Sequence, residues 1–394
     1  MGIIQITLSK KELSMRNYLI VLLFATLYSS GTLAKGLPDQ EIDKWFETAV
    51  THEHVPGITV AVGGPEGVVY AKGFGFADLE NSLPMTTEHK VRIGSVSKLI
   101  ATAGLMRLYD QGKVDLDKPV IEYAPAWSQD KPALSLRQLT SHTAGIRHYK
   151  AGADEFLLNK NFTSINESLT LFKDDPLLFT PGEKFTYSTF AWTLVSAAME
   201  GADNKRNFTQ IIQQEVFEPL GLKDTSFDDQ YEIISHRAQP YSVYQDKLFN
   251  SPQTDHSYKW AGGGFISTPS DVVRFAVAHL QNDYLKPETV NLMFTPAKLN
   301  NGDGVNFGIG WMVGFNSYKN RDSYKDNEEV LAMMESMPNA VMHSGGSMGG
   351  ITMLIMCTDH KRAVTVVKNV NGDDSADVFA LALKTLHVFH KEDN

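Results

Sequence analysis

The sequence predicts an α/β fold of the α+β kind, in which helices flank an antiparallel sheet and an all-helical insertion interrupts the chain. Near the start, a helical pattern precedes two β-rich runs separated by a glycine-rich turn. Near the end, four apolar runs precede a closing helical pattern. Between them, short helical segments alternate with Pro and Gly breaks and few strand alternations. We therefore expect both ends of the chain to build one sheet.

The first elements follow from periodicity and turn residues. Residues 37–53 carry apolar side chains at helical spacing, which predicts a helix. Residues 57–61 and 67–76 are rich in β-forming residues, and the Gly-Gly-Pro-Glu-Gly segment between them predicts the turn of a hairpin. Residues 94–111 form the next expected helix, which ends at Gly112.

The remaining elements define the predicted domains. Strands are expected at residues 307–313, 340–343, 351–357 and 363–368, and a closing helix at 377–391. The sequence then divides into an N-terminal signal peptide over residues 1–34, an α/β domain from residues 35–115 and 300–394, and a mostly helical domain over residues 116–299.

Composition excludes several classes of protein. The 394 residues include 36 Lys+Arg and 46 Asp+Glu, so the formal net charge is −10. An acidic chain without basic clusters lacks the positive footprint that nucleic acid requires, so no nucleic-acid partner is expected. Cys357 is the single cysteine, which excludes an internal disulfide. It lies in an apolar run and is interpreted as a buried structural thiol.

The N-terminus has the layout of a targeting segment. Basic residues up to Arg16 precede an apolar core of ten residues at 18–27. Thr32 and Ala34 then place small residues where a signal peptidase reads, so the mature chain would begin near Lys35 and be periplasmic or secreted, with no membrane contact after cleavage. The alternative is an uncleaved N-terminal anchor, although the apolar core is shorter than the ~20 residues of a membrane span.

The first chemical motif is Ser95-Val96-Ser97-Lys98. Residues three apart share one helix face, so the Ser95 hydroxyl and the Lys98 amine can meet. A serine hydroxyl is a weak nucleophile until a base takes its proton. The apolar residues after Lys98 would desolvate its amine, which lowers a lysine pKa and makes such a base. The N–H of Ser95, at the start of the helix, is a candidate oxyanion donor.

Two further motifs complete the candidate site. Tyr187-Ser188-Thr189 offers a tyrosine that can relay a proton if nearby cations lower its pKa from about 10. His343-Ser344-Gly345-Gly346 offers glycines against which a substrate can lie, and the Gly346 N–H is the second candidate oxyanion donor. His343 can orient Tyr187 or bind a substrate carboxylate.

Together, the three motifs resemble those of serine beta-lactamases and penicillin-binding proteins. The resemblance to the class C beta-lactamase-related family covers about residues 40–390. Its landmarks in this chain are VPG at 55–57, RIGS at 92–95, LTSHTAGI at 139–146 and AGGGFIST at 261–268. Within the family, the chain is most similar to the branch of mitochondrial serine beta-lactamase-like proteins and their bacterial relatives, through LRQL at 136–139, GIRHY at 145–149 and YSTF at 187–190.

The resemblance implies a role for each motif. Ser95 is the nucleophile, Lys98 and Tyr187 share the work of the general base, and His343 heads the third motif. Thr189, Ser344 and Gly345 are the implied substrate contacts.

The sequence departs from true class C enzymes twice: Thr189 replaces an Asn, and His343 replaces a Lys that lies near the substrate carboxylate. An unperturbed histidine, with a pKa of about 6.5, would lose that attraction above neutral pH. Activity on carboxylate-bearing substrates would then improve as pH falls from about 8 to about 6.

We therefore interpret the chain as an exported serine hydrolase that forms an acyl-enzyme on Ser95, with peptide, amide or ester substrates and no cofactor. The alternatives are a true beta-lactamase or D-alanyl-D-alanine carboxypeptidase, and an inactive binding protein on the same fold. No catalytic metal is expected, since the sequence contains no H-E-x-x-H motif. His387 and His390 share one face of the last helix and are expected to face solvent. The sequence leaves the substrate and the oligomeric state open.

Overall fold

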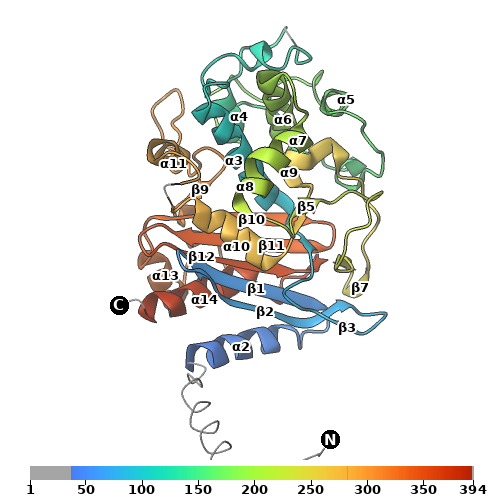
Figure 1. Cartoon of the computed structure of the whole chain (residues 1–394), viewed down its shortest axis with the longest axis vertical. Coiled ribbons are helices and arrows are strands. Elements are labelled where there is room, and N and C mark those ends of the chain that lie inside the picture. The colour runs from blue at the N-terminus through green and yellow to red at the C-terminus, as the bar shows by residue number, and fades with distance from the viewer. Residues whose placement is uncertain (1–36, 129, 282, 393–394) are drawn as a thin grey trace, which may run out of the picture. The chain divides into compact units, whose positions relative to one another are not determined.

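The computed structural model describes residues 37–128, 130–281 and 283–392, so the predicted signal peptide lies outside the described residues. From Trp45 onward the chain forms one compact unit around a seven-stranded sheet (Figure 1). The strand order is β3-β2-β1-β12-β11-β10-β9, and every neighbouring pair is antiparallel. No helix among the described residues combines the length and the apolarity needed to cross a bilayer.

The strands of this sheet are β1 (Gly57–Gly64), β2 (Gly67–Asp78), β3 (Leu83–Pro84), β9 (Met312–Val313), β10 (Ala340–Ser347), β11 (Gly350–Cys357) and β12 (Arg362–Lys368). The short strands are β4 (Val91–Arg92), β5 (Ser226–Phe227), β6 (Tyr241–Tyr244), β7 (Lys247–Asn250), β8 (Phe265–Ser267) and β13 (Val370–Asn371).

The longer helices are α2 (Leu37–Ala49), α3 (Ser97–Asp110), α6 (Phe190–Asp203), α10 (Pro269–Ala278), α11 (Pro287–Met293), α13 (Glu328–Glu335) and α14 (Val378–Glu392). The short helices are α4 (Leu136–Thr140), α5 (Ile165–Leu169), α7 (Phe208–Ile212), α8 (Glu218–Leu220), α9 (Trp260–Gly263) and α12 (Asn316–Lys319). Single turns of other helical types are η1 (Gly94–Val96), η2 (Val120–Glu122), η3 (Asp154–Leu157), η4 (Gln213–Phe217) and η5 (Ser257–Lys259).

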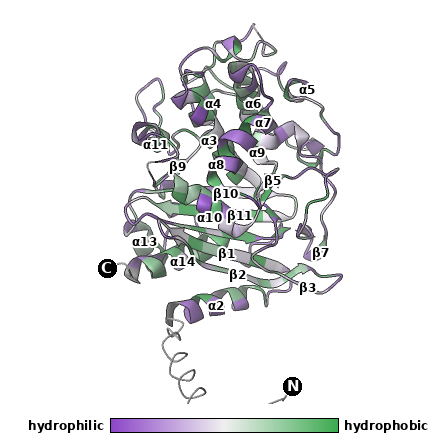
Figure 2. Ribbon diagram, in the orientation of Figure 1, coloured by the Kyte–Doolittle hydropathy of each residue, from purple (hydrophilic) through white to green (hydrophobic). Residues whose placement is uncertain are grey.

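Strands from both ends of the chain meet at the centre of the sheet, which confirms the predicted fold class. Val60 of β1 lies opposite Lys72 of β2 on one side and opposite Val366 of β12 on the other. β1 is buried along its whole length, so its near-continuous apolar run reflects a central strand covered on both faces. Figure 2 shows the same distribution, with hydrophobic colour on the strands and hydrophilic colour on the outer loops.

Two strands have different bounds in the structure from those that the sequence predicts. The strand expected at 307–313 is reduced to β9 and a single bridge between Phe307 and Met312, because Gly310 has a φ of 79° and turns the chain. The strand expected at 340–343 continues to Ser347, so the whole third motif lies within β10.

The expectation of an all-helical insertion over residues 116–299 is wrong. It contains β5, β6, β7 and β8, which are two to four residues long and too short for alternation to reveal. Within the segment, β5 pairs with β8 and β6 pairs with β7. Two of these strands also have partners outside it, because Ser267 of β8 pairs with Val91 of β4 and Tyr241 of β6 pairs with Val370 of β13. The domain boundaries at residues 115 and 300 stay a prediction, since these small sheets pair strands from both sides of them.

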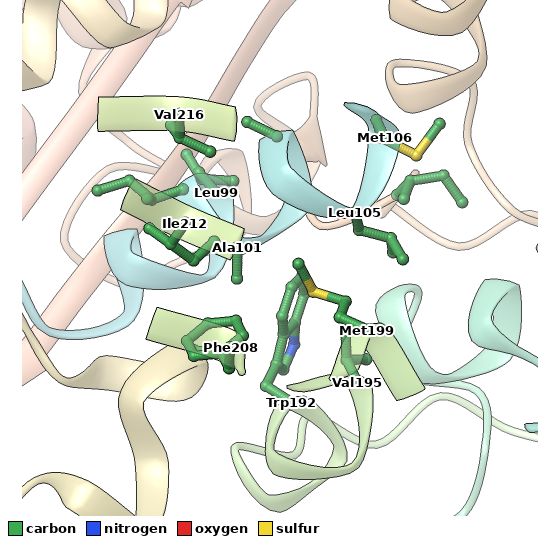
Figure 3. Packing of buried hydrophobic residues seen from close by; sticks show 14 of the residues in the cluster. Leu99, Ala101, Leu105, Met106, Trp192, Val195, Met199, Phe208, Ile212 and Val216 are labelled. Carbon is green, nitrogen blue, oxygen red and sulfur yellow. The ribbon is translucent and has the colours of Figure 1, made fainter. Parts of the chain in front are cut away.

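The core that positions the site surrounds α3. In Figure 3, Leu99 of α3 lies beside Ile212 of α7 and Val216 of η4, and Leu105 lies beside Met199 of α6. Gly104 permits this approach, because a Cβ there would lie 2.8 Å from Ile212 Cδ1. The sheet contributes to the same cluster through residues such as Leu354. The buried helix expected at 94–111 therefore begins as the turn η1 and continues as α3.

Candidate active site

Ser95 and Lys98 meet as their spacing predicts. Ser95 lies in η1, and Lys98 follows in the first turn of α3. Lys98 Nζ is 2.9 Å from Ser95 Oγ, within hydrogen-bond distance. Ser95 is partly exposed, whereas the Lys98 side chain is fully buried. The amine can therefore reach the hydroxyl from the protein side and leave the opposite side of the hydroxyl to a substrate.

The Lys98 amine is held by oxygens from two other elements. Its Nζ lies 3.2 Å from Thr189 Oγ1, before α6, and 2.5 Å from the carbonyl oxygen of Gly262 in α9. Burial lowers the pKa of Lys98 well below its ordinary value, and the charge of Lys259 lowers it further. No carboxylate forms an ion pair with Lys98 among the described residues. The surroundings thus favour a neutral amine, which can accept a proton.

Tyr187 lies beside this pair, with Lys98 Nζ 5.0 Å from its ring centroid. Burial raises the pKa of Tyr187 above its ordinary value, although a side-chain hydrogen bond to Ser95 opposes that shift. The expected lowering of the tyrosine pKa by cations is therefore wrong, because desolvation is the largest cause of the shift and outweighs the hydrogen bond to Ser95. Tyr187 keeps its proton at neutral pH.

Two histidines hold the backbone of the second motif. The Ser188 N–H donates to His142 Nδ1 at 3.1 Å, and the Thr189 N–H donates to His148 Nδ1 at 3.2 Å. The His142 ring also packs on the Tyr187 ring with centroids 4.3 Å apart. Burial lowers the pKa of His148 to about 4 and that of His142 well below its ordinary value. Both rings therefore stay neutral and keep the lone pairs that accept these hydrogen bonds.

His343 is buried, only 2% exposed, on β10. Its Nδ1 lies 2.6 Å from the carbonyl oxygen of Ser344, which can only accept, so Nδ1 carries the proton and Nε2 keeps a lone pair. Burial lowers the pKa of His343 to about 3, and protonation of Lys98 would lower it further. The expected change of charge between pH 8 and 6 is therefore wrong, since desolvation keeps this ring neutral throughout that range.

The glycines of the third motif allow two backbones to touch. A Cβ on Gly345 would lie 2.0 Å from the Ile93 carbonyl oxygen, and one on Gly94, whose φ is +50°, would lie 2.6 Å from Gly346 N. This contact places the Gly346 N–H beside the backbone of Ser95. The arrangement fits the paired N–H donors of an oxyanion hole.

A cavity of about 760 Å³ opens at Ser95. Its lining is mostly apolar and aromatic, and includes Tyr187, His343, Ser344 and Gly346 of the motifs. Further walls come from the segment 299–307 and from Phe185, Met312 and Ser317. Among the described residues that line it, Asp303 is the one with a formal charge, and none is Lys or Arg.

The structure brings all the predicted site residues together but places Thr189 differently from expectation. Thr189 is 3% exposed, and its hydroxyl contacts Lys98 within the protein, so it does not act as the expected substrate contact. Thr189 takes this position because it directly precedes α6, whose first turn lies against the Lys98 amine.

Sequence reasoning missed Gly262, His148 and Lys259. Gly262 and Lys259 lie in or next to a glycine-rich run that was noted only as a landmark. A Cβ on Gly262 would lie 2.5 Å from Thr189 Cγ2, which explains the glycine. In the described part of the chain, one group of metal-ligating side chains gathers closely enough to share an ion, and it lies outside this cavity.

Comparison with known proteins identifies relatives over most of the chain. A family model described as Beta-lactamase matches residues 42–388. The mitochondrial serine beta-lactamase-like protein LACTB of Homo sapiens is 29% identical, over 80% of this chain and 71% of its own length. The fold is similar to that of the D-amino acid amidase from Ochrobactrum anthropi SV3, with a TM-score of 0.73, 21% identity, and coverage of 91% of this chain and 100% of that one. EstCE1, a hydrolase with promiscuous acyltransferase activity, gives a TM-score of 0.72 at 22% identity, with 89% and 98% coverage.

Lys259 provides a test of how the Lys98 amine is kept neutral. Burial lowers the pKa of Lys259 itself to about 7, so its charge appears below neutral pH. Removing that charge in Lys259→Met removes one cause that lowers the Lys98 pKa. We expect the acid limb of the kcat/KM profile on a neutral ester to move to higher pH, measured by pH-rate titration.

The matched control is Lys247→Met, because Lys247 lies exposed on β7. Its acid limb should coincide with that of the unmodified protein. An acid limb that stays in place in Lys259→Met would show that Lys259 does not influence the proton acceptor.

Proposed function

The chain belongs to the beta-lactamase family, whose members include serine hydrolases, and we propose that it cleaves an ester or amide bond through an acyl-enzyme on Ser95. The observation that carries this proposal is the buried Lys98 amine 2.9 Å from the Ser95 hydroxyl. A serine paired with a neutral amine is an activated nucleophile. The cavity at Ser95 provides space for the acyl group.

In the proposed first step, the Lys98 amine takes the Ser95 proton while Oγ attacks the carbonyl carbon of the substrate. The lone pair on Nζ is available because burial lowers the Lys98 pKa. The carbonyl oxygen becomes negative, and the N–H groups of Ser95 and Gly346 stabilise it. When the bond to the leaving group breaks, the proton passes from Lys98 to that group, and water later releases the acyl group by the same steps.

Tyr187 acts in this proposal as a protonated relay and not as a second base. Its raised pKa keeps the phenol neutral, and its hydrogen bond to Ser95 places it on the path between the nucleophile and the leaving group. The packing of His142 and the backbone hydrogen bonds from Ser188 and Thr189 fix its position. A fixed relay contributes through orientation, which is lost by small displacements.

The cavity favours substrates without a carboxylate. Asp303 is exposed at its wall, where an anionic substrate would be repelled and a cationic one attracted. His343 is neutral, and its Nε2 is buried without a hydrogen-bond partner and keeps a lone pair, so the ring supplies neither a charge nor a free N–H for a substrate carboxylate. The proposed substrates are therefore neutral or cationic esters and amides with an apolar acyl group.

Acylation of Ser95 is tested with a fluorophosphonate followed by peptide mass spectrometry. We expect a single adduct on Ser95 and none in Ser95→Ala. Lys98→Met should react much more slowly, because loss of a general base typically costs about 10²–10⁴-fold in rate.

A folded Lys98→Met that labels as fast as the unmodified protein would remove Lys98 from the mechanism. Labelling of Ser95 without turnover of any ester, D-amino-acid amide or chromogenic cephalosporin would favour the binding protein over the hydrolase. Preferred turnover of the cephalosporin or of a D-alanyl peptide would favour the beta-lactamase or carboxypeptidase.

The proposed preference for uncharged substrates is tested with His343→Lys. A lysine here adds a cation that can contact a substrate carboxylate, and a charged hydrogen bond contributes roughly 1.5–3 kcal/mol. We expect the ratio of kcat/KM for a carboxylate-bearing beta-lactam to that for a neutral ester to rise by about tenfold or more, using about 1.4 kcal/mol per decade. In the unmodified protein the same ratio should stay level between about pH 6 and 8, because a histidine with a pKa of about 3 is neutral there.

His343→Gln is the matched control, since an amide has similar reach and no charge. It should leave the ratio unchanged. A ratio that rises equally in both variants would mean that the lost imidazole, and not the added charge, sets the preference.

We also propose that the chain is exported and cleaved near Ala34, on the basis of the sequence pattern over residues 1–34. N-terminal sequencing of secreted or periplasmic protein should begin near Lys35. Recovery of the uncleaved chain from the membrane fraction would support the N-terminal anchor instead.

A further inference from the structure

The turn between β11 and β12 carries a cysteine and a histidine three residues apart. Cys357 is the last residue of β11, and His360 lies in the turn before β12 begins at Arg362. Cys357 Sγ and His360 Nδ1 are 3.2 Å apart. A Cys-x-x-His turn can present both ligand atoms to one side, like the paired ligands of structural zinc sites, which have two to four residues between them.

A third metal ligand comes from the last helix. His390 had been expected to face solvent, but this is wrong because α14 packs against β11 and β12 and leaves His390 only 4% exposed. Its ring stacks on that of His360, with centroids 4.1 Å apart. The ligand atoms of Cys357, His360 and His390 all lie within 4.8 Å of one another.

The alternation of β11 explains this meeting. Leu354 and Met356 belong to the core cluster around α3, so side chains of the other parity, including Cys357, point to the opposite face of the sheet. Figure 1 shows α14 beneath the sheet, away from α3 and α6. Cys357 therefore lies at the contact between the sheet and α14.

We propose that Cys357, His360 and His390 bind a zinc ion. One thiolate and two imidazoles suit Zn²⁺ among the common divalent ions, whereas Mg²⁺ and Ca²⁺ prefer oxygen. Bonds of about 2.0–2.3 Å in a tetrahedral site bring the ligand atoms about 3.3–3.8 Å apart. The three side chains must therefore close by up to about 1.5 Å from their separations of at most 4.8 Å, and the partly exposed turn at His360 provides both that adjustment and an entry path.

Binding replaces the thiol proton. The Cys357 thiol loses its proton to solvent as sulfur bonds to the ion, the two neutral imidazoles bind through nitrogen lone pairs, and water completes the four ligands. Because the thiol must lose its proton to bind the ion, affinity should increase with pH.

The proposed ion would tie α14 to the β11–β12 hairpin, remote from Ser95. The third motif pairs with the opposite end of β11, where Gly346 lies opposite Ile351. Six residues along β11 separate Ile351 from Cys357, or about 20 Å at about 3.4 Å per residue. The site is thus independent of the proposed hydrolysis, and either proposal can fail alone.

The test is titration of the reduced, metal-free full chain with Co²⁺, which reports zinc-type sites through its visible spectrum. We expect a single equivalent to bind with tetrahedral ligand-field bands and a thiolate-to-cobalt charge-transfer band, and Zn²⁺ to remove both. Cys357→Ala should abolish the charge-transfer band. Cys357→Ala and His390→Gln should each weaken Zn²⁺ binding by at least about a hundredfold, since even residues behind the ligands contribute 10–100-fold.

His387→Gln is the matched control, because His387 lies one turn earlier on α14 and its Nδ1 is 3.4 Å from Ser336 Oγ. It should bind Co²⁺ with the spectrum and affinity of the unmodified protein. Absence of stoichiometric binding, or binding without the charge-transfer band, would overturn the site. Equal losses in His387→Gln and His390→Gln would also overturn the assignment of ligands. Ester hydrolysis measured in parallel reports the Ser95 site separately.

Discussion

The burial of the Lys98 amine is the constraint on which the rest of the site depends. An ammonium group without a carboxylate partner is costly in a water-excluded interior, so burial lowers the pKa of Lys98 and favours its neutral amine. The helix α3 creates that interior because it is apolar on nearly every face and is enclosed by α6, α7 and the sheet. The apolar core around α3 resembles the core of any domain, but in this chain it also lowers the pKa of Lys98.

Keeping an amine in the interior also requires hydrogen-bond acceptors at close range. Thr189 and the Gly262 carbonyl supply them, and both come from segments distant in sequence. Their approach leaves no space for side chains, which explains Gly262 beside Thr189 and Gly345 beside Ile93. Gly262 and Gly345 are therefore needed because backbone segments approach closely around Ser95 and Lys98, and not because the chain turns there.

This dependence on distant segments explains what the sequence could and could not predict. The fold class, the main strands and α3 follow from periodicity, and the Ser95–Lys98 contact follows from helical spacing. The functions of His148, Lys259 and Gly262 depend on tertiary neighbours, which no local pattern shows. The pKa values of Tyr187 and His343 were misjudged for the same reason, because desolvation depends on packing rather than on residue type. The burial of His390 likewise depends on tertiary packing, because the sheet covers its face of α14.

In the proposed function, one part of the site activates the Ser95 hydroxyl and another part, the cavity wall, selects the substrate. Ser95, Lys98 and Tyr187 are positioned by α3 and by the start of α6, two helices that are buried along most of their length. The cavity walls instead come largely from the loop at 299–307 and from β10. His343 links the two, because its Nδ1 is committed to the Ser344 carbonyl while Nε2 remains directed to its surroundings as an acceptor. The resemblance to class C enzymes implies a lysine at this strand position, whereas this chain has a histidine that burial keeps neutral. The proposed preference for substrates without a carboxylate therefore follows from packing as well as from residue type.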